Sequence, residues 1–132
     1  MELLNDDCLV EILKYNTIKE LIKISLLETY LIEFFKRNIK RFKIICSFSK
    51  ITDTGLQYLT GVHTINLSDC HQITDTGLQY LTGVNTINIS YCNKITDTGL
   101  QYLKGVHIIF LNGCNKITDT GLKYLKGAQI YR

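Results

Sequence analysis

The chain has 132 residues, 45% of them hydrophobic, and a formal net charge of +3. This length allows a buried core, and so small a positive excess does not indicate a nucleic-acid partner. Residues 1–7 are acidic, unlike the basic start of a secretory signal, and the apolar run 22–35 is broken by Ser25, Glu28, Thr29 and Glu33, which excludes a membrane span. We therefore expect an intracellular, cytoplasmic protein.

The composition also indicates a source. The chain has no Pro and no Trp, whereas Ile, Lys, Asn and Tyr, whose codons are AT-rich, are abundant. Large DNA viruses and some protists have AT-biased genomes of this kind, and for a viral protein the expected location is the host cytoplasm.

Residues 1–38 have a helical rhythm that differs from the rest of the chain. Asp6 and Asp7 precede Leu9, Ile12 and Leu13, which is the pattern of a short amphipathic helix. A second helix is expected to start at Asn16 or Thr17, and a third apolar run covers residues 30–35. These patterns predict a helical domain of two or three short helices that ends near residue 38.

This segment resembles an F-box. Residues 4–15 read Leu-Asn-Asp-Asp-Cys-Leu-Val-Glu-Ile-Leu-Lys-Tyr, similar to an opening of Leu-Pro, an acidic residue and a Leu-x-x-Ile-Phe/Leu run. Asn5 stands in place of the Pro, and Glu28 and Thr29 stand in place of a later Cys and its basic neighbour. The resemblance implies binding to a Skp-family adaptor of a cullin complex through Leu4, Leu9, Ile12, Leu13, Leu21 and Leu27. The alternative is a plain helical cap on the repeats that follow.

A basic cluster and an irregular segment join this domain to the rest. The cluster is Lys36, Arg37, Lys40, Arg41 and Lys43. A solvated junction is favoured over a nucleic-acid or membrane patch, because no interleaved aromatic residues accompany the charges. Hydrophobic residues at 39, 42 and 44 then fit an irregular first repeat, with residue 47 in the place of a Cys and one extra residue before position 51.

Four copies of Ile-Thr-Asp-Thr-Gly-Leu start at Ile51, Ile73, Ile95 and Ile117, each 22 residues after the last. The unit 62–83 opens with a segment that fits L-x-x-L-x-L-x-x-C, and this resembles the cysteine-containing leucine-rich repeats. The resemblance implies an α/β solenoid over residues 39–132, with short parallel strands on its concave side and short helices on its convex side.

The residue pattern within one repeat agrees with that fold. Ile65 and Leu67 alternate with polar residues and should point inward, as should two helix leucines, Leu78 and Leu81. Either Thr74 or the following aspartate caps the helix, and the repeated aspartates (Asp53, Asp75, Asp97, Asp119) are interpreted as caps. Gly77 provides either close packing or loop geometry, and Gly83 a left-handed C-cap.

The repeated polar residues do not indicate catalysis or metal binding. Cys70, Cys92 and Cys114 recur 22 residues apart, which gives one thiol per strand at a spacing of about 4.8 Å and not a tetrahedral site. We expect a buried thiol ladder bonded to the turn backbone, with no metal and no cofactor. Enzymatic activity is not expected either, because nothing sets one of the four repeated aspartates apart from the others as an acid or a base. Side chains at one further position (His63, Asn85, His107, Gln129) should be exposed, and those at another (Tyr58, Tyr80, Tyr102, Tyr124) should be half-buried on the convex side, stacked on the next repeat.

The outward strand positions predict a binding surface for a protein target. Its residues are Thr64, Asn66, Ser68, Thr86, Asn88, Ser90, Ile108, Phe110 and Asn112. Ile108 and Phe110 form an apolar spot, which either anchors a partner or shields the end of the sheet. The uncapped strand at the end of the sequence would allow self-association. The leading hypothesis is a substrate-recognition subunit of a cullin-based ubiquitin ligase; the alternative is a scaffold module with no ubiquitin link.

Overall fold

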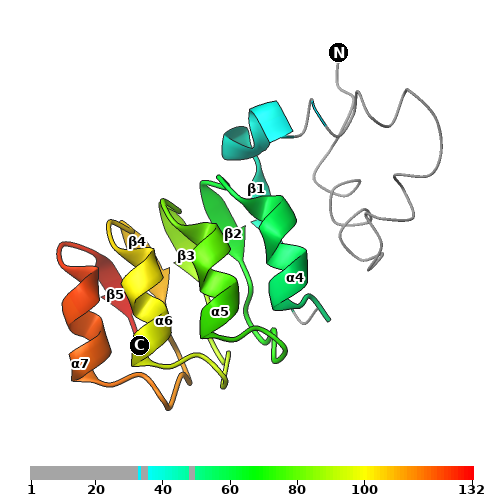
Figure 1. The fold of residues 1–132 in the computed structure, drawn as a ribbon. Coiled ribbons are helices and arrows are strands. Elements are labelled where there is room, and N and C mark those ends of the chain that lie inside the picture. Colours follow the sequence, from blue (N-terminus) through cyan, green and yellow to red (C-terminus); the bar gives the residue numbers. More distant parts are fainter. Residues whose placement is uncertain (1–32, 34–35, 48–49) are drawn as a thin grey trace.

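The computed structural model describes residue 33 and residues 36–47 and 50–132. Its five strands form one sheet in chain order, all parallel: β1 (Lys43–Ile45), β2 (Thr64–Asn66), β3 (Thr86–Asn88), β4 (Ile108–Phe110) and β5 (Gln129–Tyr131). Figure 1 shows the strands in one row and the helices in a second row beside it. The predicted solenoid of consecutive parallel strands and short helices is confirmed.

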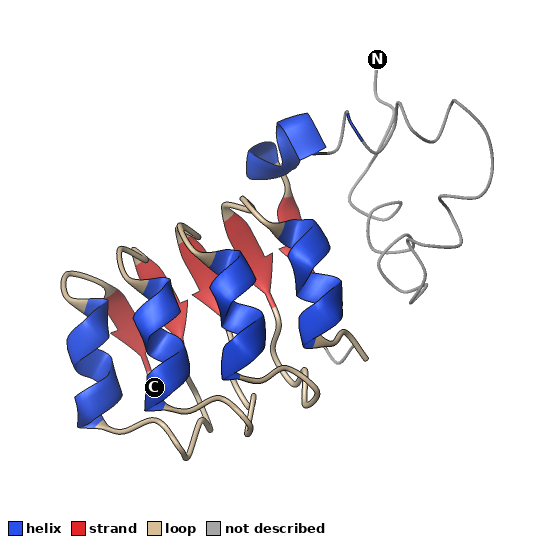
Figure 2. Cartoon of the chain, viewed as in Figure 1, coloured by secondary structure: helices blue, strands red, loops and turns tan. Residues whose placement is uncertain are grey.

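Each helix of the repeats is one α-turn followed directly by a 3₁₀ turn, and Figure 2 draws the two turns together as one blue helix. The α-turns are α4 (Asp53–Leu56), α5 (Asp75–Leu78), α6 (Asp97–Leu100) and α7 (Asp119–Leu122). The 3₁₀ turns are η2 (Gln57–Leu59), η3 (Gln79–Leu81), η4 (Gln101–Leu103) and η5 (Lys123–Leu125), and η1 (Ile39–Arg41) precedes β1. The predicted helical domain over 1–38, with Leu4, Leu9, Ile12, Leu13, Leu21 and Leu27, lies outside the described residues apart from residue 33 and residues 36–38.

The core lies between the two rows. Ile65, Leu67, Leu78 and Leu81 are at most 2% exposed, so the inward positions predicted for one repeat are confirmed. Their counterparts in the neighbouring repeats form one continuous buried cluster. Each fully buried aliphatic side chain contributes roughly 1.5–3 kcal/mol, and a single repeat could not bury its own apolar face.

The interpretation of the aspartates as helix caps is wrong. The cap is the preceding threonine: the Oγ1 of Thr96 accepts a hydrogen bond from the backbone N–H of Thr98. The carboxylate of Asp75 instead reaches the next repeat, where it accepts from the backbone N–H of Thr96 at 2.7 Å and from its hydroxyl at 2.6 Å. Asp53 and Asp97 bridge in the same way to the repeats after them.

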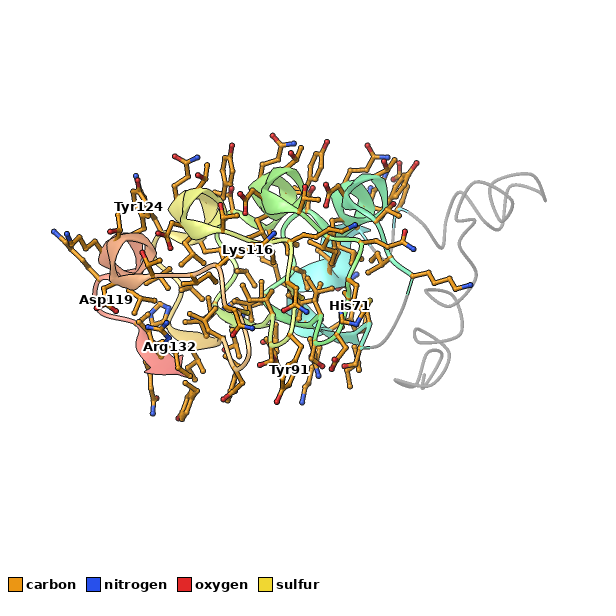
Figure 3. The ribbon with its side chains drawn as sticks, turned by 90° about the horizontal axis from the view of Figure 1, so that it is seen from below. His71, Tyr91, Lys116, Asp119, Tyr124 and Arg132 are labelled. Carbon is orange, nitrogen blue, oxygen red and sulfur yellow. The ribbon has the colours of Figure 1, made fainter. Side chains whose placement is uncertain are left out.

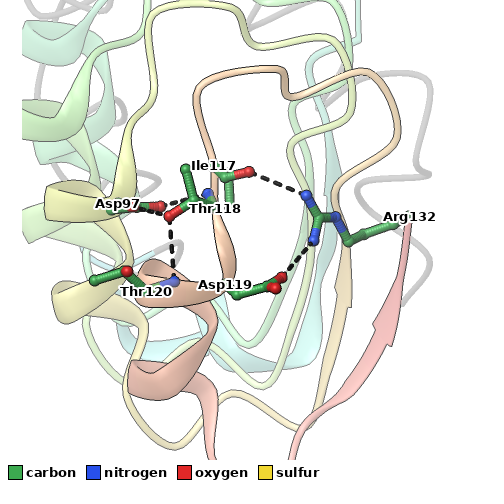
Figure 4. A network of polar contacts seen from close by, with 6 residues as sticks. All are labelled: Asp97, Ile117, Thr118, Asp119, Thr120 and Arg132. Atoms are coloured by element: carbon green, nitrogen blue, oxygen red, sulfur yellow. Dashed lines mark hydrogen bonds and ion pairs between the residues drawn. The ribbon is translucent and has the colours of Figure 1, made fainter.

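Figure 4 shows the last of these aspartate bridges, from Asp97 to Thr118. Asp119 occupies the equivalent position one repeat later, and its carboxylate contacts the guanidinium of Arg132 at 3.4 Å. The other terminal nitrogen of Arg132 donates to the carbonyl oxygen of Ile117 at 3.0 Å. In place of a threonine bridge, Asp119 therefore has an exposed ion pair.

Gly77 is required for close packing, which was one of the two predicted alternatives. A β-carbon built at this position would overlap the carboxylate of Asp53, and Gly99 and Gly121 meet Asp75 and Asp97 in the same way. The glycine in each helix therefore makes room for the aspartate bridge of the repeat before it. The predicted left-handed C-cap is also confirmed, since Gly83 has a φ of +85°.

The first repeat is aligned differently from the prediction. Ile44 pairs with Ile65, and the N–H of Cys46 donates to the carbonyl of Asn66 just as the next repeat's Leu67 donates to Asn88. Cys46 therefore occupies the position of Leu67, and Ser47 does not replace a ladder cysteine. From Ile44 to Ile51 the chain is one residue shorter than from Ile65 to Ile73, not longer. Strand alternation decides this alignment, because it buries position 44 and exposes its two neighbours.

The last strand shows a second one-residue shift. Ile109 pairs with Ile130, an offset of 21 residues, whereas β2, β3 and β4 follow one another at 22. The strict period predicted that Gln129 is the equivalent of His107, but Gln129 pairs with Ile108 instead. The shift also brings Tyr131 into register with Phe110.

Candidate protein-interaction surface

The outward side chains of the five strands form two parallel columns, which together we call the strand face. Register fixes both columns, because parallel strands in register place equivalent side chains directly beside one another. The first column is Lys43, Thr64, Thr86, Ile108 and Gln129, and the second is Ile45, Asn66, Asn88, Phe110 and Tyr131. The structure thus brings together the predicted target-binding residues of β2, β3 and β4, and adds neighbours from β1 and β5 that the prediction did not include.

The centre of the strand face is neutral and rich in hydrogen-bonding groups. Asn66 Oδ1 accepts from the backbone N–H of Ser68 at 3.0 Å, and Asn88 Oδ1 accepts from that of Ser90 at 2.9 Å. These bonds fix the orientation of both amides. Within the described part of the chain nothing accepts their NH₂ groups, so both present donors to a bound molecule.

One end of the strand face is aromatic. The rings of Phe110 and Tyr131 stack with centroids 4.6 Å apart and planes 10° from parallel. The side-chain amide of Gln129 donates to the Tyr131 hydroxyl. Sequence reasoning found Phe110 but not Tyr131, because a strict 22-residue period places Tyr131 beside the buried Ile109. The sequence did contain a signal: the segment from Gly127 to the strand isoleucine Ile130 is one residue shorter than the equivalent segment from Gly105 to Ile109.

The predicted residues that follow each strand do not all face outward. Ser68 and Asn112 are half-buried, but Ser90 is only 4% exposed, so its prediction as a target-binding residue is corrected: it has almost no surface to offer. Asn112 contributes to this burial, since its side-chain NH₂ donates to the Ser90 hydroxyl at 3.4 Å.

Tyr91 is a surface residue that sequence reasoning missed. It has a φ of +61°, in the left-handed region, which costs a residue with a β-carbon roughly 1–2 kcal/mol. Its side chain is 50% exposed, and the ring lies against Gly113, where a β-carbon would overlap it. The sequence signal was the repeat position itself, because Asp69 and Gly113 occupy it in the adjacent copies and both tolerate this backbone conformation.

Most of the exposed large hydrophobic side chains lie on the strand side of the solenoid. Within the described residues they are Ile45, Tyr91, Tyr124 and Tyr131. Ile45 and Tyr131 belong to the strand face, and Figure 3 shows Tyr91 on the strand side and Tyr124 on the opposite, helix side. Three of the four therefore lie on or beside one surface, with Ile45 and Tyr131 at its opposite edges.

The cysteines form the predicted buried ladder. The Sγ atoms of Cys70, Cys92 and Cys114 donate to backbone carbonyls of the preceding repeat at 2.8, 3.1 and 3.1 Å. Burial raises the thiol pKa of Cys46 and of Cys92 to about 12. These thiols therefore pack and bond as neutral groups and are poor nucleophiles or metal ligands.

The remaining polar positions are surface features. His63 and His107 are exposed, and an Nδ atom of His107 lies 2.8 Å from the side-chain nitrogen of Asn85. The convex tyrosines are half-buried except Tyr124, whose ring has the Lys104 ammonium 5.5 Å from its centroid. In the described ranges, no three His, Cys, Asp or Glu side chains are grouped to hold a metal ion, and no helix there is both long and apolar enough to cross a bilayer.

Of the comparisons with known proteins, the match to a family model agrees with this architecture. A family model described as "Leucine Rich repeat" matches residues 62–81, 84–104 and 111–126, so these three segments are leucine-rich repeats. No curated protein matches the chain. Among solved structures it is similar to a chain in the crystal structure of the Rad7 and Elc1 complex in yeast, with a TM-score of 0.43 and 14% identity. That match covers 67% of this chain and 31% of the other, so this chain spans less than a third of its length.

Proposed function

We propose that this chain is a protein-interaction adaptor that holds a target protein on its strand face and performs no bond chemistry of its own. The observation that carries the proposal is the strand face itself: it is neutral at its centre, it presents free amide donors, and at one end it has the half-buried ring of Phe110 stacked on the exposed Tyr131. Buried aromatic anchors surrounded by polar contacts are typical of the central part of protein interfaces.

The finer proposal is that the adaptor serves a cullin-based ubiquitin ligase as its substrate-recognition subunit. Its support is the F-box resemblance of residues 3–35, which would bind a Skp-family adaptor. The strand face would then raise the local concentration of the target near the ligase, and tethering alone would account for the activity. The second candidate, a scaffold with no ubiquitin link, keeps the same target surface and differs only in the role of residues 1–38.

The chain supplies its own variant to test target binding. Ile108→Thr with Phe110→Asn changes β4 to Thr-Ile-Asn, the sequence that β2 and β3 already have. The variant should fold and should lose the partners that the wild type retains in affinity purification from the native cell. Lys104→Thr on the helix side is the matched control, because Thr60 and Thr82 occupy that position in other repeats. Equal partner recovery with all three proteins would contradict a target site on the strand face.

The ligase role is tested separately by pull-down with a purified Skp-family adaptor and cullin. We expect the wild type to bind and Ile12→Asp to bind much less, because a buried charge in a helical interface is strongly unfavourable. Absence of binding by the wild type would leave the scaffold as the function.

A further inference from the structure

Positive charge gathers at one end of the strand face. Lys40 and Arg41 end η1, Lys43 opens β1, and all three side chains are exposed. Lys43 is in register with Thr64 and therefore belongs to the first column of the strand face. In the described segments none of the three forms an ion pair, whereas the nearby Arg37 pairs with Glu33 at 3.3 Å.

Among the described residues, little negative charge opposes this cluster on the strand side. The described strands contain no acidic residue, and the acidic residue nearest in sequence to a strand end is Asp69, which is half-buried after β2. The bridging aspartates begin the helices and are occupied by threonines of the next repeat. The end of the strand face at β1 is therefore complementary to a negatively charged partner.

From these observations we propose that the strand face receives an extended, acidic segment of the partner protein that also contains an aromatic residue. The acidic side chains would lie against Arg41 and Lys43, and the aromatic side chain against the Phe110–Tyr131 pair. This inference rests on the proposed function, because it specifies the chemistry of the target at the same surface.

The spacing between the two ends sets the length of the segment. β1 and β4 are three strand positions apart, and at about 4.8 Å per position this is roughly 14 Å. An extended chain covers that distance in about four residues, at 3.3–3.6 Å each. Between the two ends, the free amide donors of Asn66 and Asn88 lie where the backbone carbonyls of the segment would pass.

The observations favour a protein segment over a nucleic acid. A polynucleotide carries charge along its whole length and needs basic side chains along its path, but β2, β3 and β4 present none. The aromatic rings are stacked on each other at 4.6 Å, so no base fits between them.

The test uses the full chain and three polymers: a random Glu/Tyr copolymer, poly-glutamate, and single-stranded oligo-dT. Fluorescence anisotropy should show tightest binding to the Glu/Tyr copolymer, weakening as salt rises. Arg41→Glu with Lys43→Glu should weaken that binding at least about tenfold, since both contacts become repulsive. Lys94→Glu with Lys116→Glu makes the same change in net charge in exposed loops elsewhere and should have little effect.

The aromatic end is tested by Phe110→Ala, which should weaken binding to the Glu/Tyr copolymer and leave poly-glutamate binding unchanged. The inference is overturned if the copolymer does not bind, if both charge-reversal pairs weaken it equally, or if oligo-dT binds more tightly. These results are separate from the fate of the proposed function. Loss of native partners by the β4 variant, without copolymer binding, would retain the target site and reject only the acidic segment.

Discussion

Gly99→Ala tests whether the aspartate bridges hold successive repeats together. Alanine is a better helix former than glycine by about 0.8–1.0 kcal/mol, so on local grounds the substitution should stabilise α6. However, the new methyl group would overlap the Asp75 carboxylate and lie 3.1 Å from a methyl of Leu78. Displacing the carboxylate gives up two hydrogen bonds from Thr96. At roughly 1.5 kcal/mol each for a charged acceptor, the net result is a destabilisation of about 2 kcal/mol.

A double-mutant cycle with Asp75→Ala separates this mechanism from a simple loss of space. Asp75→Ala alone should cost about 3 kcal/mol, because both bonds to Thr96 are lost. Once the carboxylate is gone, adding Gly99→Ala should cost nothing or stabilise by up to about 1 kcal/mol, which gives a coupling of about 2–3 kcal/mol between the two sites. Urea unfolding followed by far-UV circular dichroism measures each free energy.

Gly55→Ala is the matched control for the cycle. In the described part of the chain its methyl group would meet only the Ile51 side chain and no carboxylate, so Asp75→Ala should not change its effect. Additive free energies for Asp75→Ala and Gly99→Ala, or a higher stability of Gly99→Ala itself, would refute the reasoning.

Three further predictions concern acid stability, thiol chemistry and Tyr91. Hydrogen bonds from the side chain and backbone of Thr118 hold the pKa of Asp97 below its ordinary value of 3.8. Such a carboxyl contributes stability that is present above its unfolded pKa and lost as pH falls through its native pKa. Asp97→Asn should therefore flatten the acid side of a plot of urea midpoint against pH, and an unchanged slope would contradict the bridge. Cys46 and Cys92 are buried and their thiol pKa values are raised, so iodoacetamide at mildly alkaline pH should modify them in urea but not in the native protein. Peptide mass spectrometry locates the modified residues. Rapid modification of either thiol in the native protein would show that it is accessible to solvent. Tyr91→Asn places a residue that tolerates the left-handed conformation at an exposed position, so it should change the unfolding free energy by less than about 1 kcal/mol. It should nevertheless reduce recovery of the native partner. Unchanged recovery would exclude Tyr91 from the interface.

The sequence predicted the interior of the repeats well because the interior obeys a local rule. Alternation in the strand predicts that Ile65 and Leu67 point inward, and the three-residue spacing in the helix predicts the same for Leu78 and Leu81. The fixed period then assigns the equivalent residues of the other repeats. The same period misplaced residues wherever the chain departed from it by one. The 21-residue offsets at β1 and β5 moved Cys46 into a core position and Tyr131 onto the strand face.

The aspartates show a different limit of sequence reasoning. An acidic residue at a helix start is usually assigned to that helix, because capping and the helix dipole are local effects. Here the partner of Asp75 is Thr96, which is 21 residues away and comes near only after the repeats stack. Gly99 was the clue, because a glycine inside a helix costs stability unless something packs where its side chain would be.

The repeats differ more in character on the strand face, the proposed target site, than on the helix side. On the helix side the copies differ by exchanges of one polar residue for another, such as Thr60 and Thr82 against Lys104 and Lys126. On the strand face the sequence is Thr-Ile-Asn in both β2 and β3, but it is Ile-Ile-Phe in β4 and Gln-Ile-Tyr in β5. An aromatic residue therefore replaces the outward asparagine in the last two strands. The central isoleucine stays because it faces the core. The core, the thiol ladder and the aspartate bridges are present in repeats with either set of outward side chains. If the aromatic residues serve the proposed target site, the β4 variant loses its partners and keeps its unfolding free energy. If they instead shield the end of the sheet through the stack of Phe110 on Tyr131, the variant loses stability, and this is why its unfolding free energy is measured beside its binding.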